Sequence, residues 1–229
     1  ACSSGVVSAT PEAVTTAGPP WYGVRVASDI ELFRAWRAGD RQAGSLLFAR
    51  HFDAIYRFFR NKLDDDIEDL VQRTFVACVE GRERFREEAS FRTYLFAVAH
   101  NLLREHLRRK RRAPERVDLD EVSVVDLGAS PISLVVAQAE ERVLLQALRR
   151  IPVNSQVILE LYFWEKLSGA EIGAFLGVVE DTARSRIRKA KQQLEAMIRR
   201  IEAAPRELES TLSNLEQWAD AIRRQLAPS

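Results

Sequence analysis

Apolar residues recur at helical spacing over two long stretches of the chain. Between residues 47 and 63 they fall on one helix face, and the same three- and four-residue spacing continues from Ile67 to Cys78 and from Tyr94 to Leu107. A second block with this period runs from about residue 139 to Ile201. Polar residues fill the positions in between, on the opposite face, as in amphipathic helices. The pattern therefore predicts an all-α protein with two small helical domains.

The helical blocks are separated by segments without a clear period. Residues 113–137 contain Pro114, Gly128 and Pro131 together with acidic side chains, which is typical of a flexible acidic linker. A coil of this length spans about 25–30 Å on average. The five predicted segments are a flexible tail (1–28), a first helical domain (29–112), the linker (113–137), a second helical domain (138–201) and an amphipathic helical extension (202–229).

The second domain has the order of elements of a helix-turn-helix. Ser168 and Glu171 form an S-x-x-E capping box at the start of a short helix, and Gly177 is placed to end that helix in a left-handed conformation. A longer basic helix follows, and in this motif the second helix enters the major groove of DNA. Its face opposite the apolar stripe carries the candidate DNA contacts Thr182, Arg184, Ser185, Arg188, Lys189 and Gln192.

The net charge of +1 conceals a strong alternation of charge along the chain. Residues 104–116 hold seven basic and two acidic side chains, whereas residues 117–141 hold six acidic side chains and no Lys or Arg. Residues 184–200 again hold seven basic side chains, with one acid. This alternation indicates two surfaces that bind polyanions, separated by an acidic linker that repels them.

The last helix of the first domain combines aromatic, polar and basic side chains. Aromatic faces can stack on unpaired bases while arginines bind phosphates, so this helix is a candidate for binding single-stranded nucleic acid. Some of the rings must instead belong to the core. The residues in question are Phe91, Tyr94, Phe96, His100, Asn101, Arg104 and Arg108.

Signatures of enzymes, metal sites and membrane proteins are missing from the sequence. There is no G-x-S-x-G, P-loop, H-E-x-x-H or G-x-G-x-x-G motif, and the carboxylates of residues 64–69 lack the spacing of a calcium loop. We therefore expect no catalytic residue, metal or cofactor. No signal peptide or membrane span is visible, and two cysteines are too few for a disulfide scaffold. The expected location is the cytoplasm.

Three motifs, in order along the chain, resemble bacterial sigma factors of the extracytoplasmic-function (ECF) group. Residues 66–75 resemble that family's D-x-E-D-L-V-Q-x-T-F helix, which binds core RNA polymerase. Residues 84–109 resemble its promoter-melting segment, and residues 167–186 resemble the helix-turn-helix of its region 4. The resemblance covers about residues 30–112 and 138–200, and it implies a region 2 helical bundle followed by a region 4 domain.

The resemblance also implies partners and site residues. Region 2 would bind the clamp helices of the polymerase β′ subunit through Asp66, Glu68, Asp69 and Gln72. It would read and open the minus-10 element through Arg86, Ser90, Phe91, Tyr94, His100, Asn101, Arg104 and Arg108. Region 4 would bind the β flap and read the minus-35 element through Thr182, Arg184, Ser185, Arg188 and Lys189. Residues 202–229 exceed the family pattern, and we expect either an anti-sigma factor or self-inhibition by this extension to control activity.

Two other functions fit parts of the pattern. A stand-alone helix-turn-helix regulator would bind duplex DNA tightly by itself, with the symmetry of a dimer. An all-helical protein-interaction adaptor would have no salt-dependent affinity for nucleic acid. A sigma factor would instead bind DNA weakly as a free chain and gain specificity together with core polymerase.

Overall fold

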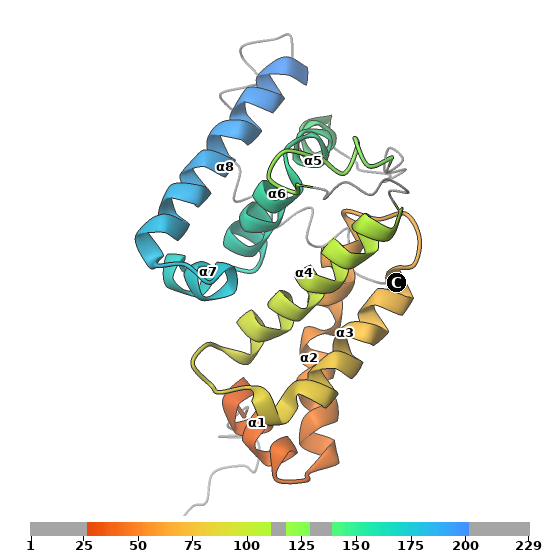
Figure 1. Cartoon of the computed structure of the whole chain (residues 1–229), viewed down its shortest axis with the longest axis vertical. Helices are drawn as coiled ribbons and strands as arrows, with labels where there is room; N and C mark the ends of the chain where they lie inside the picture. The colour runs from red at the N-terminus through yellow and green to blue at the C-terminus, as the bar shows by residue number, and fades with distance from the viewer. Residues whose placement is uncertain (1–26, 111–117, 129–138, 202–229) are drawn as a thin grey trace, which may run out of the picture.

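The regular structure of the chain is helical wherever it is described. A computed structural model describes residues 27–110, 118–128 and 139–201, and within these ranges the one β-type pairing is an isolated bridge between Ser123 and Pro152. The elements are α1 (Asp29–Arg37), α2 (Arg41–Arg60), α3 (Ile67–Gly81), η1 (Arg82–Arg84), α4 (Phe91–Lys110), α5 (Ala139–Arg150), α6 (Val153–Leu159), η2 (Glu160–Trp164), α7 (Gly169–Leu176) and α8 (Glu180–Ile201) (Figure 1). The predicted all-α class is confirmed. None of the described helices is both long and apolar enough to cross a membrane.

Helices α1 to α4 form the N-terminal bundle, whose interior is rich in aromatic rings. The ring of Phe33, fully buried on α1, meets that of Phe85 edge-on at a centroid distance of 4.9 Å, and its centroid is 5.7 Å from that of Phe91 on α4. Helix α1 starts at a capping box formed by Ser28 and Glu31. The stripe predicted on α3 is buried as expected, including Cys78, except that Phe75 is half-buried.

Helices α5 to α8 form the C-terminal bundle, in which α8 packs against α5, α6 and α7. The buried side of α8 carries the stripe Ala183, Ile187, Ala190 and Leu194 that the spacing predicts. Pro152 precedes α6 as its N-cap residue. The π-helical turn η2 extends α6 and leads into α7.

Part of the linker is packed, unlike the free coil that its composition predicts. Leu119 and Val124 are buried, and the backbone amides of Val153 and Asn154 donate hydrogen bonds of 3.0 Å to the carbonyls of Val122 and Leu119. Burial of the two apolar side chains accounts for this order. The rest of the linker, residues 1–26 of the tail and the extension 202–229 lie outside the described residues.

The two bundles are in direct contact. Figure 1 shows the C-terminal bundle above the N-terminal bundle, with α7 lying next to α4. The loop from residue 118 to 128 joins this contact, since Asp120 accepts a 2.9 Å hydrogen bond from Asn154 at the start of α6. The contact brings the face of α4 that carries His100 against the C-terminal bundle.

Candidate nucleic-acid interface

The helix-turn-helix of α7 and α8 has the local geometry that the sequence predicts. Ser168 and Glu171 cap each other, with the amide of Glu171 3.2 Å from the Ser168 hydroxyl and the amide of Ser168 2.9 Å from the Glu171 carboxylate. Gly177 ends α7 with a φ of +66°. A Cβ atom on Gly173 would lie 2.8 Å from the carbonyl oxygen of Val178, so the tight turn requires glycine there.

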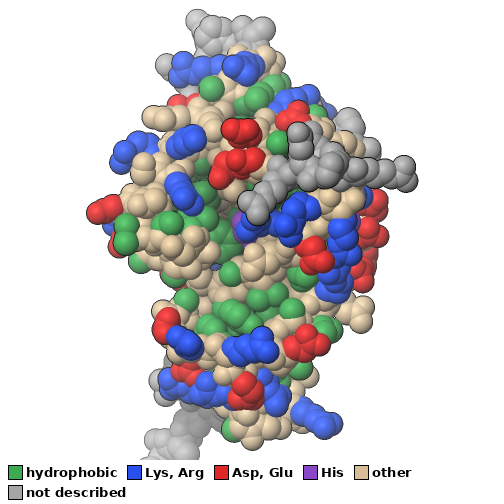
Figure 2. Space-filling view, viewed as in Figure 1, with side chains coloured by type: hydrophobic (Ala, Val, Ile, Leu, Met, Phe, Trp, Pro, Cys, Tyr) green, Lys and Arg blue, Asp and Glu red, His purple; other side chains and the backbone are tan. Residues whose placement is uncertain are grey.

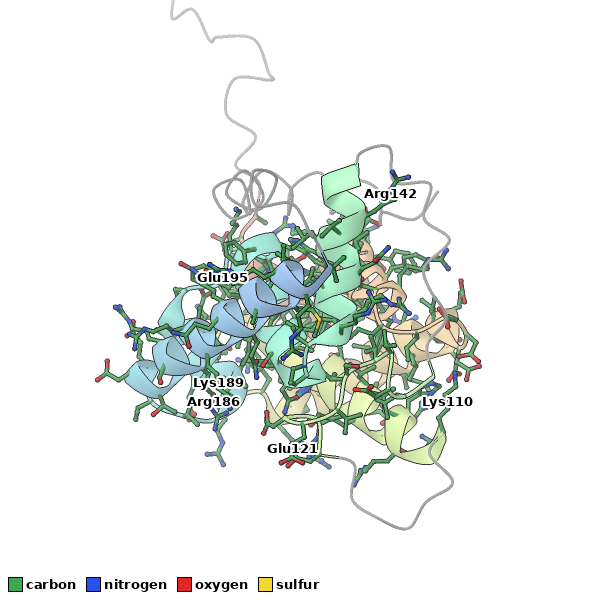
Figure 3. The ribbon with its side chains drawn as sticks, turned by 90° about the horizontal axis from the view of Figure 1, so that it is seen from above. Lys110, Glu121, Arg142, Arg186, Lys189 and Glu195 are labelled. Atoms are coloured by element: carbon green, nitrogen blue, oxygen red, sulfur yellow. The ribbon has the colours of Figure 1, made fainter. Side chains whose placement is uncertain are left out.

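The exposed face of α8 presents every residue predicted to contact the minus-35 element. Thr182, Arg184, Ser185, Arg188 and Lys189 are all exposed. The Arg184 guanidinium is 2.6 Å from the carboxylate of Glu180, one turn earlier. Figure 3 shows Arg186 and Lys189 pointing outward from α8, while Lys110 of α4 projects on the opposite side of the molecule.

A groove beside α8 adds a basic residue that the sequence analysis did not select. It has a volume of about 540 Å³, and Ser168, Arg184, Arg188 and Lys191 line it together with Tyr162. The Lys191 ammonium lies 4.5 Å from the centroid of the Tyr162 ring, a cation–π contact that orients it. The spacing of Lys191 from Arg184 and Arg188, seven and three residues, places it on the same side of the helix and could have revealed it.

Helix α4 exposes some of the residues predicted to contact the minus-10 element and buries others. Asn101, Arg104 and Arg108 are exposed, as are Arg86 and Ser90 before the helix. Lys and Arg side chains gather over the C-terminal end of α4 and over α8 on the face seen in Figure 2.

Of the two predicted minus-10 aromatic residues, Phe91 needs correction and Tyr94 is partly covered. Phe91 is only 2% exposed, within the aromatic cluster of the N-terminal bundle, so it supports the core. Tyr94 is half-buried, and its ring centroid is 4.9 Å from that of Phe85. Both residues lie at the start of α4, where the sequence alone does not distinguish a ring that packs inward from one that faces outward.

His100 is partly covered by the C-terminal bundle. Its Nε2 atom is 3.0 Å from the side-chain oxygen of Asn154, and its ring centroid is 5.3 Å from that of Phe175 on α7. Burial lowers the pKa of His100 to about 4, so the imidazole is neutral at pH 7. In this arrangement the predicted minus-10 residue His100 is half-buried, with part of its ring covered by Phe175.

Helix α3 exposes all four residues predicted to bind polymerase. Asp66, Glu68, Asp69 and Gln72 are exposed along its first two turns. Asp66 is the N-cap residue but makes no side-chain cap bond, and its φ is +56°. The Asp69 carboxylate is 3.6 Å from Arg73, one turn later.

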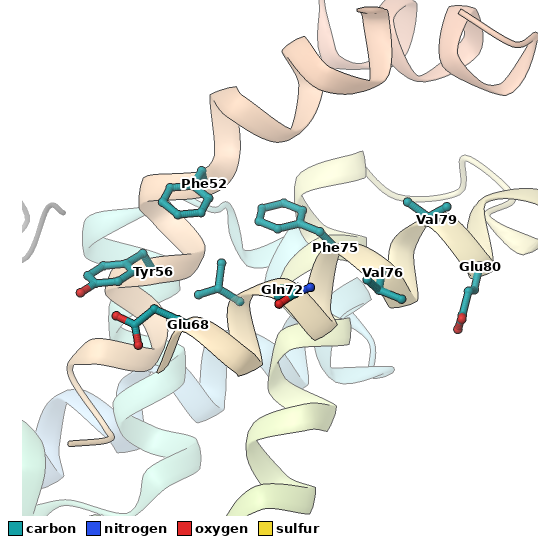
Figure 4. A pocket seen from close by; sticks show the side chains of 9 residues that line it. Phe52, Tyr56, Glu68, Gln72, Phe75, Val76, Val79 and Glu80 are labelled. Atoms are coloured by element: carbon teal, nitrogen blue, oxygen red, sulfur yellow. The ribbon is translucent and has the colours of Figure 1, made fainter. Parts of the chain in front are cut away.

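An apolar groove follows the same side of α3. It has a volume of about 560 Å³ and lies between α2, which contributes Phe52 and Tyr56, and α3 (Figure 4). Val76 and Val79 on its α3 side are 47% and 43% exposed. They stand outside the buried stripe of α3, and two apolar residues there were the signal that the sequence analysis passed over.

One group of side chains within residues 27–110, 118–128 and 139–201 has the composition of a metal site. The ligand atoms of Asp65, Asp66 and His106 lie within 4.8 Å of one another. The Asp65 carboxylate, however, pairs with the ammonium of Lys110, and this hydrogen bond lowers the pKa of Asp65. The group is therefore explained as an ion-pair cluster that joins the end of α4 to the start of α3.

Comparisons with known proteins agree with this geometry. Residues 47–113 match sigma-70 region 2 and residues 141–194 match sigma-70 region 4. The chain is 30% identical over 173 residues to the ECF RNA polymerase sigma factor SigM of Mycobacterium tuberculosis, covering 75% of this chain and 85% of SigM. It is 26% identical over 180 residues to the ECF sigma-E factor of Haemophilus influenzae, covering 75% and 95%.

A solved structure has the same arrangement of helices. CnrH, in complex with the cytosolic domain of CnrY, is 26% identical to this chain and superposes with a TM-score of 0.54 over 74% of this chain and 96% of CnrH. With both regions matched in order on the two bundles, the chain belongs to the ECF sigma factors of bacterial RNA polymerase.

Proposed function

We propose that this sigma factor, which directs RNA polymerase to promoters, acts through three surfaces. These are the acidic and apolar side of α3, the basic strip of α4 and the exposed face of α8. Each surface has a different partner, and none of them requires a reacting group or cofactor. The chain would therefore act by binding alone, in the cytoplasm.

The side of α3 with Glu68, Asp69 and Gln72 would bind the clamp helices of the β′ subunit. Charged and polar side chains would flank a contact whose centre is the groove lined by Phe52, Val76 and Val79. Protein interfaces commonly combine an apolar centre with a polar rim in this way. The exposure of both valines supports this assignment, because exposed apolar side chains that gather in one patch mark interaction sites.

The strip of α4 with Asn101, Arg104 and Arg108 would bind the minus-10 element. Opening of the duplex would be driven by binding, since each base captured by stacking returns about 1–3 kcal/mol against unpairing costs of a similar size. Tyr94 and His100 remain candidates for base contacts, whereas Phe91 would act by supporting the start of α4. Phe175 of the C-terminal bundle covers part of the His100 ring.

The face of α8 with Thr182, Arg184, Ser185, Arg188 and Lys189 would read the minus-35 element in the major groove. Lys191, held over Tyr162, would bind a backbone phosphate beside it. The β flap would bind elsewhere on the C-terminal bundle. The observation that carries the proposal is that all five predicted residues are exposed on the second helix of a correctly capped helix-turn-helix.

The decisive experiment mixes the chain with core polymerase on a library of promoter sequences and sequences the RNA that forms. We expect initiation at a subset of promoters that core polymerase alone does not use. Val76→Asp should abolish binding to polymerase, and Arg188→Ala should weaken the minus-35 preference while leaving polymerase binding intact. Glu83→Gln, which removes an exposed charge that is paired with Arg82 and is not among the predicted contact residues, is the matched control. Tight duplex binding by the free chain, without initiation, would instead support a stand-alone regulator.

Regulation is proposed to depend on a protein partner or on the chain's own extension. CnrH was solved with the cytosolic domain of CnrY, which makes an anti-sigma partner a reasonable expectation for this chain. Residues 202–229 are the second candidate, because their sequence has an amphipathic helical period. Deleting them should raise promoter-specific transcription if they inhibit, and unchanged transcription would remove them as a regulator.

A further inference from the structure

The loop that leads into α4 is attached to helix α1. We call residues 86–90 the 86–90 loop, and Glu87 lies near its middle. The guanidinium of Arg34 donates two hydrogen bonds, of 2.7 and 3.0 Å, to one oxygen of the Glu87 carboxylate. The guanidinium of Arg37 lies 2.9 Å from the other oxygen. Arg34 and Glu87 are 53 residues apart in the chain, so this attachment belongs to the tertiary fold.

The backbone of Glu87 has an unusual conformation. Its φ is +60°, in the left-handed region that glycine adopts freely and a longer side chain adopts at a cost in free energy. Such a residue persists where the surrounding structure holds it in place. The Glu87 side chain is only 17% exposed, between the two arginines. Glycine would adopt this φ without strain, so the carboxylate is what position 87 contributes.

The two ion pairs of Glu87 form one network. The hydrogen bond from Arg34 holds the pKa of Glu87 below its usual value, so the carboxylate is charged at neutral pH. Hydrogen bonds between charged groups are stronger than those between neutral groups. A single exposed ion pair stabilises little, whereas one carboxylate shared by two guanidiniums of the same helix has both of its oxygens fixed. The network is therefore suited to setting the conformation of a short loop.

Both ends of the 86–90 loop are fixed as well. Just before the loop, the ring of Phe85 is 7% exposed and meets that of Phe33 on α1 at a centroid distance of 4.9 Å. At its end, the hydroxyl of Ser90 accepts a 3.1 Å hydrogen bond from the amide of Thr93 in the first turn of α4. Glu87 is the anchor between these two points, so α1 helps to decide which way the other side chains of the loop face.

Covered and exposed side chains alternate along this anchored segment. Phe85 is buried and Glu87 is half-buried, whereas Arg86, Glu88 and Ser90 are exposed. Arg86 and Ser90 are among the residues predicted to contact the minus-10 element. Without its ion pairs, Glu87 could leave the strained left-handed conformation, and the exposed side chains would then lose their common direction.

We propose that Arg34 and Arg37 are positioning residues for promoter opening. By holding Glu87, they fix the 86–90 loop so that Arg86 and Ser90 meet the minus-10 strand in a pre-formed arrangement. A surface that is ordered beforehand loses less conformational freedom on binding, so more of the binding energy remains to hold the strands apart. The inference rests on the proposed role of this loop and α4 at the minus-10 element. The two arginines act through Glu87 and do not contact DNA.

The test uses holoenzyme assembled from core polymerase and the full chain, on a promoter selected from the library. Opening is measured as the permanganate reactivity of unpaired thymines at the minus-10 element. Glu87→Asn removes the carboxylate, and asparagine tolerates the left-handed conformation, so this variant keeps the backbone of the loop. Opening should fall by about ten-fold, as for the loss of one captured base. Polymerase binding and the minus-35 preference should not change.

A mutant cycle distinguishes positioning from direct contact with DNA. Arg34→Gln with Arg37→Gln should lower opening as much as Glu87→Asn does, and all three changes together should lower it no further. Arginines that bound phosphates themselves would make the triple variant open less than Glu87→Asn. Glu83→Gln breaks an exposed ion pair with Arg82 in the turn before the loop, so it is the matched control and should leave opening unchanged.

Two results would overturn the positioning role alone. The first is full opening by Glu87→Asn while Arg86→Ala is defective, because the loop would then act without being held by α1. The second is a triple variant that opens less than Glu87→Asn, which would assign the arginines to DNA. Full opening by both Arg86→Ala and Glu87→Asn would contradict the proposed role of the loop at the minus-10 element and would remove the inference with it.

Discussion

The interior of the N-terminal bundle and the contact between the two bundles are both buried, but they are built from opposite chemistry. The interior is a cluster of rings around Phe33, Phe85 and Phe91. The contact between the bundles, which we call the polar interface, is a set of desolvated charges around Lys62 and Glu160. Apolar burial stabilises whichever state excludes water, whereas buried charges gain little over their hydrated forms. The difference predicts that the aromatic interior contributes more to stability than the polar interface does.

The largest effect is expected in the aromatic interior. Phe33→Ala removes a fully buried ring that contacts Phe85, Phe91 and Trp36, and it should lower the free energy of unfolding by about 3–5 kcal/mol. Urea unfolding followed by circular dichroism measures this loss. Leu46→Ala, at a side chain that is 60% exposed, should stay within about 0.5 kcal/mol of the unaltered chain. Equal losses for the two variants would contradict the large contribution of this interior to stability.

The second effect concerns the polar interface and has the opposite sign. The double substitution Lys62→Met with Glu160→Gln replaces the ion pair by uncharged side chains of similar volume and keeps an oxygen that accepts from Asn61 and Gln156. It removes the cost of burying two charges and should therefore stabilise the contact between the bundles. Promoter-dependent transcription with core polymerase should fall if the bundles have to separate before α4 binds DNA. The single change Lys62→Met leaves Glu160 buried without its ammonium partner, so it should favour separation of the bundles. Transcription that is unchanged in the double variant would show that separation is not required.

The contrast between the two regions also separates what could be predicted from the sequence from what could not. The helices, the cap formed by Ser168 and Glu171 and the exposed face of α8 follow from patterns within a few turns of chain. The pair of Lys62 and Glu160 joins positions 98 residues apart, and no local pattern indicates it. Its two members look like ordinary surface residues in the sequence.

The candidate site divides in the same way. The residues on α3 and α8 are exposed as predicted, because helical period alone decides which side of an amphipathic helix faces water. On α4 the prediction partly failed, since that helix has the N-terminal bundle on one side and the C-terminal bundle on another. Phe91 packs on the first and His100 on the second. The packed loop around Leu119 and Val124 was missed because two apolar residues form no period.

Acidification should weaken the contact between the two bundles. The pKa of His100 is about 4 while the bundles are in contact and near its usual value of 6.5 when the ring is hydrated. The form with separated bundles therefore binds more protons between these two pH values. The contact between the bundles is therefore most stable above pH 6.5, and its free energy falls by about 2 kcal/mol by pH 5. Besides Asn154 and Phe175, the charged groups that act on His100 are Arg104, Lys62 and Asp120.

Labels on cysteines introduced at Leu46 of α2 and Val179 before α8, in a chain with Cys2 replaced by serine, report the distance between the bundles. This distance, measured from pH 7.5 to pH 5, tests the dependence. His100→Gln keeps a polar side chain that can reach Asn154 but does not titrate in this range. It should flatten the response to pH while the bundles of the unaltered chain separate. An identical response in both proteins would assign the titration to another group.

The smallest effect is expected at the start of α7, where a single cap can be compared with a similar hydroxyl elsewhere. Ser168→Ala removes the acceptor for the amide of Glu171 and should destabilise the C-terminal bundle by about 1 kcal/mol. The matched control is Ser45→Ala on α2, since the Ser45 hydroxyl bonds only to a carbonyl within its own helix, and alanine is favoured at such a position. Thermal unfolding should show a lower midpoint for Ser168→Ala and an unchanged midpoint for Ser45→Ala. If Ser168→Ala lowered the free energy of unfolding as much as Phe33→Ala does, the cap would also be needed for the contact between α7 and α4. The two bundles would then be less independent than their chemistry indicates.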